Sequence, residues 1–261
     1  MRFLTYAAIL AAMWLPSGAI AASHFIPDCA GGVEIAHAHV VRVEKNGALI
    51  LEDGRAVMLE GIRLPGADGA PAELSDRALA ALREMALAGP VTFTAVPPKE
   101  DRYDRIRAQA FGDAWFQAAL LEKGLARVAI SPDRNECAPD LYEAEQDARA
   151  KHAGLWASVT NAPRPPEAMP QAMKGASSGF QIVDGWVTRV GKSDGRVFID
   201  FGSDGRQVFS AVIEAEDRRA FRGFDLDGLE AHHIRIRGMV QDFHGRPQIE
   251  LSNPSQIEVL N

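Results

Sequence analysis

Residues 40–66 read VVRVEKNGALILEDGRAVMLEGIRLPG, and this stretch decides the fold of the first half of the chain. Apolar and polar residues alternate over 36–43, 48–51 and 56–61, a pattern typical of strands with one buried face. The dipeptides Asn46-Gly47 and Asp53-Gly54 separate the three runs and favour tight hairpin turns. The stretch therefore predicts an antiparallel meander of strands at the start of a β-rich domain.

The residues that follow complete a recognisable order of elements. Apolar residues recur at helical spacing over 72–89, and Gly89-Pro90 ends this predicted helix. Two more strands are predicted over 91–96 and 106–111, and further helices over 115–123 and 141–152. Three strands, a helix and two strands form the order of an OB-fold, a small Greek-key barrel whose open face often binds oligomers.

The second half repeats this order without repeating the residues. Alternation predicts strands over 181–190, 196–201 and 208–213, then a short helical stretch over 215–221. Strands over 234–240 and 247–251 close the pattern. The predicted fold class is therefore mainly β with α (α+β). It comprises two OB-fold-like five-stranded barrels, the first with extra helices.

A proline-rich segment, NAPRPPEAMPQAMKGASSG, lies between the two halves at residues 161–179. Its composition predicts a semi-extended linker, and an ordered strap lying on one domain is the alternative. The predicted organisation is a signal peptide over 1–22, a first domain over 29–160, the linker, and a second domain over 180–261.

The N-terminus has the pattern of a secretory signal peptide. Arg2 gives a short basic start, an apolar run covers residues 3–15, and Ala19-Ile20-Ala21 is a small-residue cleavage pattern. An anchor that is never cleaved is the alternative. Since no other apolar run is long enough to span a bilayer, the sequence predicts a periplasmic or secreted protein without membrane attachment after cleavage.

The only two cysteines, Cys29 and Cys137, both follow the predicted signal peptide. In an oxidising compartment an even pair predicts a disulfide, and two separate buried thiols are the alternative. Such a bond would close a long loop and contribute about 4 kcal/mol in the chain-entropy model.

The formal net charge of −7 limits the classes of partner. Both halves are net acidic, so neither offers the broad positive surface on which sequence-independent nucleic-acid binding depends. Any such binding has to come from a small local patch. Four aromatic residues of the second half could stack bases or fill the core: Trp186, Phe198, Phe201 and Phe209.

Four segments carry a resemblance to a known family. They are residues 40–66, DRYDRIRAQAF at 101–111, ALLEKGLARV at 119–128 and AGLW at 153–156. In this order and spacing, residues 40–157 resemble the thermonuclease, or staphylococcal-nuclease-like, family. The second half is similar to the accessory OB-type domain of some exported bacterial members. The resemblance implies an OB-fold and Ca²⁺-assisted hydrolysis of phosphodiester bonds.

Most of the residues that this chemistry needs are missing. The family's two metal-binding aspartates correspond to Gly47 and Arg63, and its general-base glutamate corresponds to Gly66. A phosphate-binding arginine of the third strand corresponds to Met58, and only Arg105 matches the family. The resemblance therefore implies a nuclease scaffold whose metal site and base are lost.

Arg63 and Arg105 are then predicted to bind phosphate together, because a planar guanidinium matches phosphate geometry. The sequence predicts a non-hydrolytic protein without a metal or other cofactor. Its expected ligands are short single-stranded oligonucleotides, bound weakly, other phosphate-bearing molecules, or envelope proteins.

Two other functions stay open. One is an active metal-dependent phosphodiesterase (a nuclease) with an altered metal site, in which Glu44, Glu60 or Asp68 replaces a lost carboxylate. The other is an envelope protein-interaction module in which neither barrel contacts nucleic acid.

Overall fold

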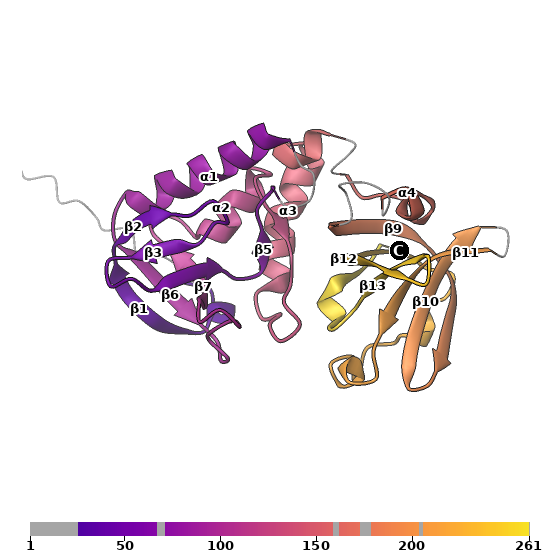
Figure 1. Ribbon diagram of the computed structural model, residues 1–261. Coiled ribbons are helices and arrows are strands. Elements are labelled where there is room, and N and C mark those ends of the chain that lie inside the picture. The colour runs from indigo at the N-terminus through magenta and orange to yellow at the C-terminus, as the bar shows by residue number, and fades with distance from the viewer. Residues whose placement is uncertain (1–25, 67–70, 159–161, 173–178, 204–205, 261) are drawn as a thin grey trace, which may run out of the picture.

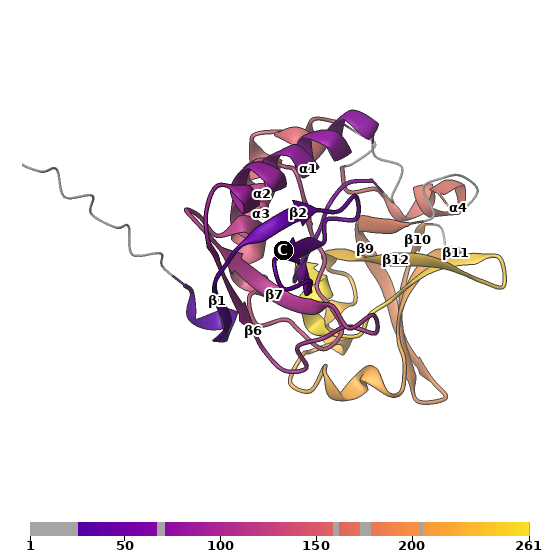
Figure 2. The ribbon, with the colours of Figure 1, turned by 60° about the vertical axis from the view of Figure 1, so that its left-hand side comes forward.

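The computed structural model describes residues 26–66, 71–158, 162–172, 179–203 and 206–260 of the 261-residue chain. The predicted signal peptide, at residues 1–22, lies outside these ranges. The chain forms two β-rich lobes side by side, and long helices accompany only the first lobe (Figures 1 and 2).

The first lobe is built on one sheet with the strand order β1-β6-β7-β4-β3-β2. Only His39 separates β1 from β2, so these two strands are one bent run of chain. Because they are also the two edges of the sheet, the sheet curves round into a barrel. His37, at a φ of 51°, lies where the β1–β6 register shifts, as in a β-bulge that bends a strand. The strands are β1 (Gly32–Ala38), β2 (Val40–Val43), β3 (Leu49–Leu51), β4 (Ala56–Leu59), β6 (Val91–Ala95) and β7 (Ile106–Phe111).

Three helices cover this barrel: α1 (Ala72–Leu87), α2 (Phe116–Glu122) and α3 (Ala138–Ala150). The α1 helix, which the sequence predicted, buries Ala78, Leu79, Leu82 and Ala86 at helical spacing. α3 begins three residues earlier than predicted, with Pro139 in its first turn, where proline is tolerated. Within the described ranges, no helix combines the length and apolar character that a membrane span requires.

A short ribbon of two strands was not predicted. β5 (Ile62–Arg63) pairs antiparallel with β8 (Arg127–Val128) beside the barrel. Each strand has two residues, too few to give an alternating pattern in the sequence.

The second lobe is a closed five-stranded barrel, as predicted. Its sheet has the order β13-β11-β10-β9-β12-β14. β13 also pairs with β12, so the five strands from β13 to β12 close the barrel and β14 extends the sheet beyond it. Phe201 and Phe209 are fully buried in its core, whereas Trp186 is 56% exposed. The strands are β9 (Phe180–Ser193), β10 (Arg196–Ser203), β11 (Arg206–Ile213), β12 (His233–Phe243), β13 (Arg246–Glu250) and β14 (Ile257–Val259).

The short helical stretch predicted over 215–221 is a single 3₁₀ helix, Asp217–Arg219, rather than an α-helix. A second 3₁₀ helix, Asp227–Leu229, follows it. The stretch EAEDRRA offers no apolar stripe, and so short a segment cannot support an isolated α-helix. Phe221, at its end, is buried in the barrel core and anchors the connection instead.

The proline-rich linker is an ordered strap over residues 162–172, rather than the predicted semi-extended tether. It forms a 3₁₀ turn at Pro166–Ala168 and the short helix α4 (Met169–Ala172). Met169 is fully buried in the core of the second barrel, and the Arg164 amide donates to the Ile182 carbonyl at 2.9 Å. The apolar side chains of the strap explain this packing, which composition alone did not indicate.

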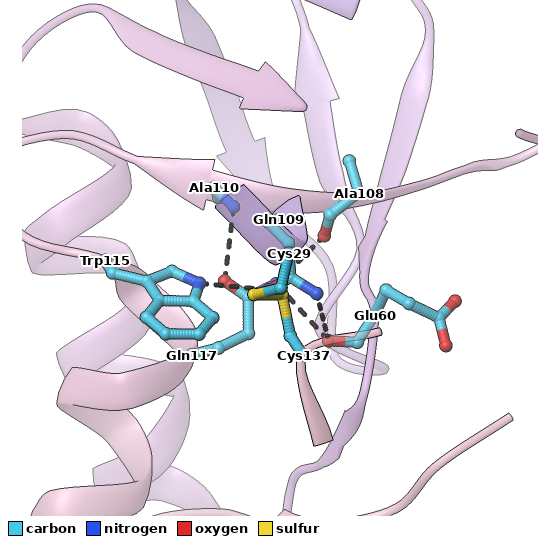
Figure 3. Close-up of a disulfide and its surroundings, with 8 residues drawn as sticks. All are labelled: Cys29, Glu60, Ala108, Gln109, Ala110, Trp115, Gln117 and Cys137. Carbon is cyan, nitrogen blue, oxygen red and sulfur yellow. Dashed lines mark hydrogen bonds between the residues drawn. A yellow bond between two sulfur atoms is a disulfide. The ribbon is translucent and has the colours of Figure 1, made fainter. Parts of the chain in front are cut away.

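Cys29 and Cys137 form a disulfide, as predicted, with Cα atoms 5.0 Å apart. It joins the N-terminal 3₁₀ turn, Asp28–Ala30, to the residue before α3. Figure 3 shows the bond, and Gln109 lines a small pocket together with both cysteines. The disulfide therefore ties the start of the domain to its last long helix.

Candidate ligand-binding site

A pocket of about 510 Å³ opens on the first barrel, a size that suits a small organic ligand. Its lining comes from the β2–β3 turn, β4, β5 with the loop after it, and α1. The lining residues are Lys45, Asn46, Gly47, Met58, Leu59, Ile62, Arg63, Leu64, Pro65, Gly66 and Ser75. The fold thus brings together Gly47, Met58, Arg63 and Gly66, all four positions at which the resemblance implied a lost catalytic or binding group.

Gly47 lies in a tight turn that accepts no side chain without adjustment. Its φ is +86°, which L-residues rarely adopt, and a Cβ there would lie 2.8 Å from Leu64 Cδ1. The Gly47 amide donates to the Glu44 carbonyl at 3.0 Å, and Asn46 Oδ1 accepts from the Ala48 amide at 3.0 Å. Leu64 thus packs where a metal-binding side chain would begin.

Gly66 is constrained in a similar way. Its φ is +147°, and a Cβ would lie 3.1 Å from Ser75 Oγ. That hydroxyl donates to the Pro65 carbonyl at 3.0 Å and ties the loop to α1. The backbone at the position of the expected general base therefore favours glycine.

Arg63 lies at the junction of two pockets. Its strand β5 is held by pairing with β8 and by a hydrogen bond of 2.9 Å from the Ala129 amide to the Gly61 carbonyl. Besides the first pocket, Arg63 lines a second one of about 290 Å³ between the barrels. Arg63, the cation at the rim of the first pocket, therefore belongs to the β5–β8 ribbon, which the sequence did not predict.

Arg105 does not line either of these two pockets. Its guanidinium donates to the Asp101 carboxylate, Nε to Oδ2 at 2.8 Å, and lies 5.0 Å from the ring centre of Tyr103. Burial alone would raise the pKa of Asp101, but hydrogen bonds from Arg105 and two main-chain amides lower it. Arg105 therefore stabilises its own turn, and the fold does not place it beside Arg63 in the pocket.

Lys45 is a pocket residue that sequence reasoning missed. It lies directly before the Asn46-Gly47 turn and lines the pocket with Arg63. The signal available in the sequence was the position of Lys45, a basic residue next to the Asn46-Gly47 turn that corresponds to a metal-binding turn of the family. Lys45 and Arg63 therefore line the pocket where the family has acidic metal ligands.

Neither of the two described carboxylates that could replace the lost ligands reaches the pocket. Glu60 is 8% exposed; it accepts from Ser131 Oγ at 2.5 Å and lies 3.7 Å from Arg107 Nε. In Figure 3 its main-chain oxygen accepts from Gln117, and its carboxylate points away. Glu44 pairs with Arg42 at 2.9 Å. Asp68 lies outside the described residues.

The described lining does not fit Ca²⁺. This ion takes six to eight oxygen ligands, mostly carboxylates and carbonyls, and no lining residue is acidic. A guanidinium at position 63 would repel it, since two unit charges at 4 Å interact by about 4 kcal/mol at an effective dielectric of 20 and Ca²⁺ carries twice that charge. Within the described residues there is also no cluster of three or more His, Cys, Asp or Glu that could hold a metal.

A buried ionic network joins the two barrels behind Arg63. Arg237 of β12, 1% exposed, donates to Glu145 Oε2 at 3.0 Å, to the Glu258 carboxylate, and to the Val128 carbonyl at 3.1 Å. Burial alone would lower the pKa of Arg237, but the carboxylates of Glu145 and Glu258 raise it. Arg237 therefore stays charged.

The same network reaches the ribbon that carries Arg63. Glu145 of α3, fully buried, also accepts from the Val128 amide at 2.7 Å. Val128 pairs with Ile62, the residue before Arg63. Next to the network, Ala148 and Trp156 of the first domain pack against Phe180 and Ile182 of β9. The second barrel thus helps to position Arg63.

Residues 56–158 match the family model described as "Staphylococcal nuclease homologue". The match begins at β4 and includes Met58, Arg63, Gly66 and Arg105, while Gly47 lies before it. Residues 56–158 are therefore a domain of the staphylococcal nuclease family, whose domains bind nucleic acids in general. A search of curated proteins gave no match to the chain.

Proposed function

We propose that this protein is a non-hydrolytic member of the nuclease family that binds a phosphate-bearing ligand without divalent metal. The proposed ligand is a short single strand of nucleic acid, bound weakly in the first pocket. One observation carries the proposal: Lys45 and Arg63 line the pocket at the position of the family's active site, where none of the described lining residues is acidic.

The pocket offers both parts of such a recognition site. Arg63 can donate two parallel hydrogen bonds to a phosphate, and Lys45 adds a point charge. Apolar side chains form much of the remaining wall, among them Met58, Ile62 and Leu64. They suit the uncharged part of a nucleotide, since ligand pockets combine apolar walls with a few placed polar groups.

The acidic protein around the pocket limits how much negative charge it can hold. The net charge is −7, and two cations line the pocket. Only one or two phosphates can therefore be neutralised, and affinity should be modest and depend only weakly on salt.

Hydrolysis is disfavoured by the same geometry. A general base must lie within hydrogen-bond reach of the attacking water, and the described lining contains neither a carboxylate nor an imidazole. We further propose that the protein acts outside the cytoplasm. The signal-peptide pattern of residues 1–22 and the Cys29–Cys137 disulfide support this placement.

The test combines binding and cleavage. The chain without residues 1–22 is mixed with labelled single-stranded DNA and RNA in EDTA, and separately with Ca²⁺, Mg²⁺, Mn²⁺ or Zn²⁺. The proposal predicts binding in EDTA and no cleavage with any metal. Arg63→Ala should lose binding, while Arg42→Ala, which removes an exposed arginine paired with Glu44, should not. Metal-dependent cleavage would instead establish the rival function, an active phosphodiesterase.

A further inference from the structure

The second pocket, between the barrels, has no role in the function proposed above. The first barrel contributes Arg63, Ile130 and Pro132 to it, and the second barrel contributes Met239 and Gln241. Figure 1 shows β5, the strand of Arg63, on the side of the first barrel that faces β12 and β13. Arg63 lines both pockets, so the two cavities share this residue.

The charges of the second pocket suit an uncharged group. Among its described lining residues, three are charged: Arg63, Arg237 and Glu250. Arg237 is compensated by two carboxylates, so it offers no charge to a ligand. Burial and the nearby Asp217 both raise the pKa of Glu250. A second phosphate would meet the Glu250 carboxylate and an Arg237 that is already compensated, so the second pocket suits an uncharged group.

The second barrel offers surfaces that fit a flat polar ring. Met239 is 45% exposed, and its polarizable thioether makes favourable contacts with aromatic rings. Gln241, two residues further along β12 on the same face, is also exposed. Its amide can both donate and accept hydrogen bonds, as the edge of a nucleobase requires.

We infer that the second pocket is a subsite for the group attached to the far side of the phosphate at Arg63. The ligand is then a phosphodiester whose two organic substituents lie in different pockets, one lined by each barrel. The group in the second pocket is uncharged and planar, in the manner of a nucleobase. This inference rests on the proposed function only in taking Arg63 as the phosphate-binding residue.

The buried network makes such a bridging site preformed. Arg237 fixes the second barrel to Val128, the partner of β5. This hydrogen bond thus links the two walls of the second pocket before the ligand arrives. A preformed site binds without the cost of ordering its parts.

Trp186 provides a matched control on the same two strands. It pairs with His233 at one end of the β9–β12 ladder, whereas Met239 pairs with Phe180 at the other end. Both side chains are large and exposed. Trp186 stacks on the His233 ring at 5.2 Å and does not line the second pocket.

The test compares thymidylyl-(3′→5′)-thymidine with the methyl ester of thymidine 5′-monophosphate, a mononucleotide whose phosphodiester carries the same single charge, by calorimetry in EDTA. We expect the dinucleotide to bind about tenfold more tightly, within the range that one packed base contributes. Met239→Ala should remove this gain and leave mononucleotide binding unchanged, and Gln241→Ala should reduce the gain. Trp186→Ala should preserve it.

The outcomes separate this inference from the proposed function. Equal affinities of the two probes for the unmodified protein would overturn the subsite alone, and so would a Met239→Ala variant that weakens both probes equally. If the protein binds neither probe, both the proposed function and the subsite are overturned.

Discussion

The guanidinium of Arg237, in the second barrel, donates a hydrogen bond of 3.1 Å to the main-chain oxygen of Val128, in the first. Val128 pairs with Ile62, which precedes Arg63 in the chain. A single buried side chain of one domain therefore supports the strand that presents the proposed phosphate ligand of the other. The second barrel is part of the site's architecture and cannot be treated as an independent appendage.

Replacing Arg237 with alanine should strongly destabilise the protein. The fully buried Glu145 would lose its partner, and breaking a buried ion pair costs about 3–5 kcal/mol. Arg235→Ala, on the same strand but paired mainly with the partly exposed Asp184 at 2.6 Å and only at 3.8 Å with Glu258 of the network, should cost clearly less. Urea unfolding of both variants measures the difference, and similar losses would show that the network is not the main link between the barrels.

The network should also make stability depend on pH in the acid range. Burial would raise the pKa of Glu258, but Arg237 and Arg149 outweigh it and hold the pKa below the ordinary value of 4.5. Because the folded pKa is the lower one, Glu258 stabilises the fold above about pH 4.5, and this contribution is lost as pH falls through the folded pKa.

Urea unfolding from pH 7 down to pH 3 measures this loss. Asp101 and Asp133 also have lowered pKa values, so the comparison with Glu258→Gln isolates the effect of Glu258. The variant should show a shallower decline below pH 4.5. An identical decline in both proteins would remove Glu258 from the explanation.

The turn at Gly47 should resist any side chain, including the aspartate of the nuclease family. Gly47→Ala would force a residue with a Cβ into a φ of +86° and within 2.8 Å of Leu64. The backbone conformation alone costs about 1–2 kcal/mol, and the contact adds a smaller cost because Leu64 Cδ1 is the end of a flexible side chain that can shift.

Gly54→Ala is the matched control, because Gly54 has a φ of +84° and nothing within 4 Å of a Cβ. It should show the backbone cost only. The extra loss at position 47 should shrink when Leu64 is also replaced by alanine, as a thermal unfolding series can measure. Equal losses of stability for Gly47→Ala and Gly54→Ala would mean that Leu64 does not block the position that corresponds to the family's metal-binding aspartate.

The disulfide should contribute a large share of stability, because its cysteines are separated by 108 positions in the sequence. Closing a loop of about 100 residues is worth about 4.7 kcal/mol in the chain-entropy model. The double variant Cys29→Ala, Cys137→Ala should therefore lower the free energy of unfolding by about 3–5 kcal/mol. A reducing agent should destabilise the unmodified protein and leave the double variant unaffected. A loss below 1 kcal/mol would contradict the expectation.

Much of the fold could be read from the sequence, because strand alternation and Asn-Gly or Asp-Gly turns are local signals. The β5–β8 ribbon could not, since its strands are too short to show a period. Arg237 also gave no signal, because arginine is rarely fully buried and only tertiary structure supplies its carboxylate partners.

The site was predicted only in part. Gly47, Met58, Arg63 and Gly66 do converge on one pocket, as their positions in the resemblance implied. Arg105 does not line that pocket because Asp101, four residues earlier, binds its guanidinium. That competition depends on the local turn and cannot be read from the match to a family position.

The salt dependence of oligonucleotide binding in EDTA tests the central claim most directly. A short labelled single strand is titrated across a range of salt against the unmodified protein, Arg63→Ala and Arg105→Ala. With one or two phosphates neutralised, the log–log slope should lie between about −0.7 and −1.4. Arg63→Ala should flatten this slope and weaken binding, and Arg105→Ala should change both far less. Binding that requires Ca²⁺, or that is unchanged by the loss of Arg63, would contradict a metal-free phosphate site.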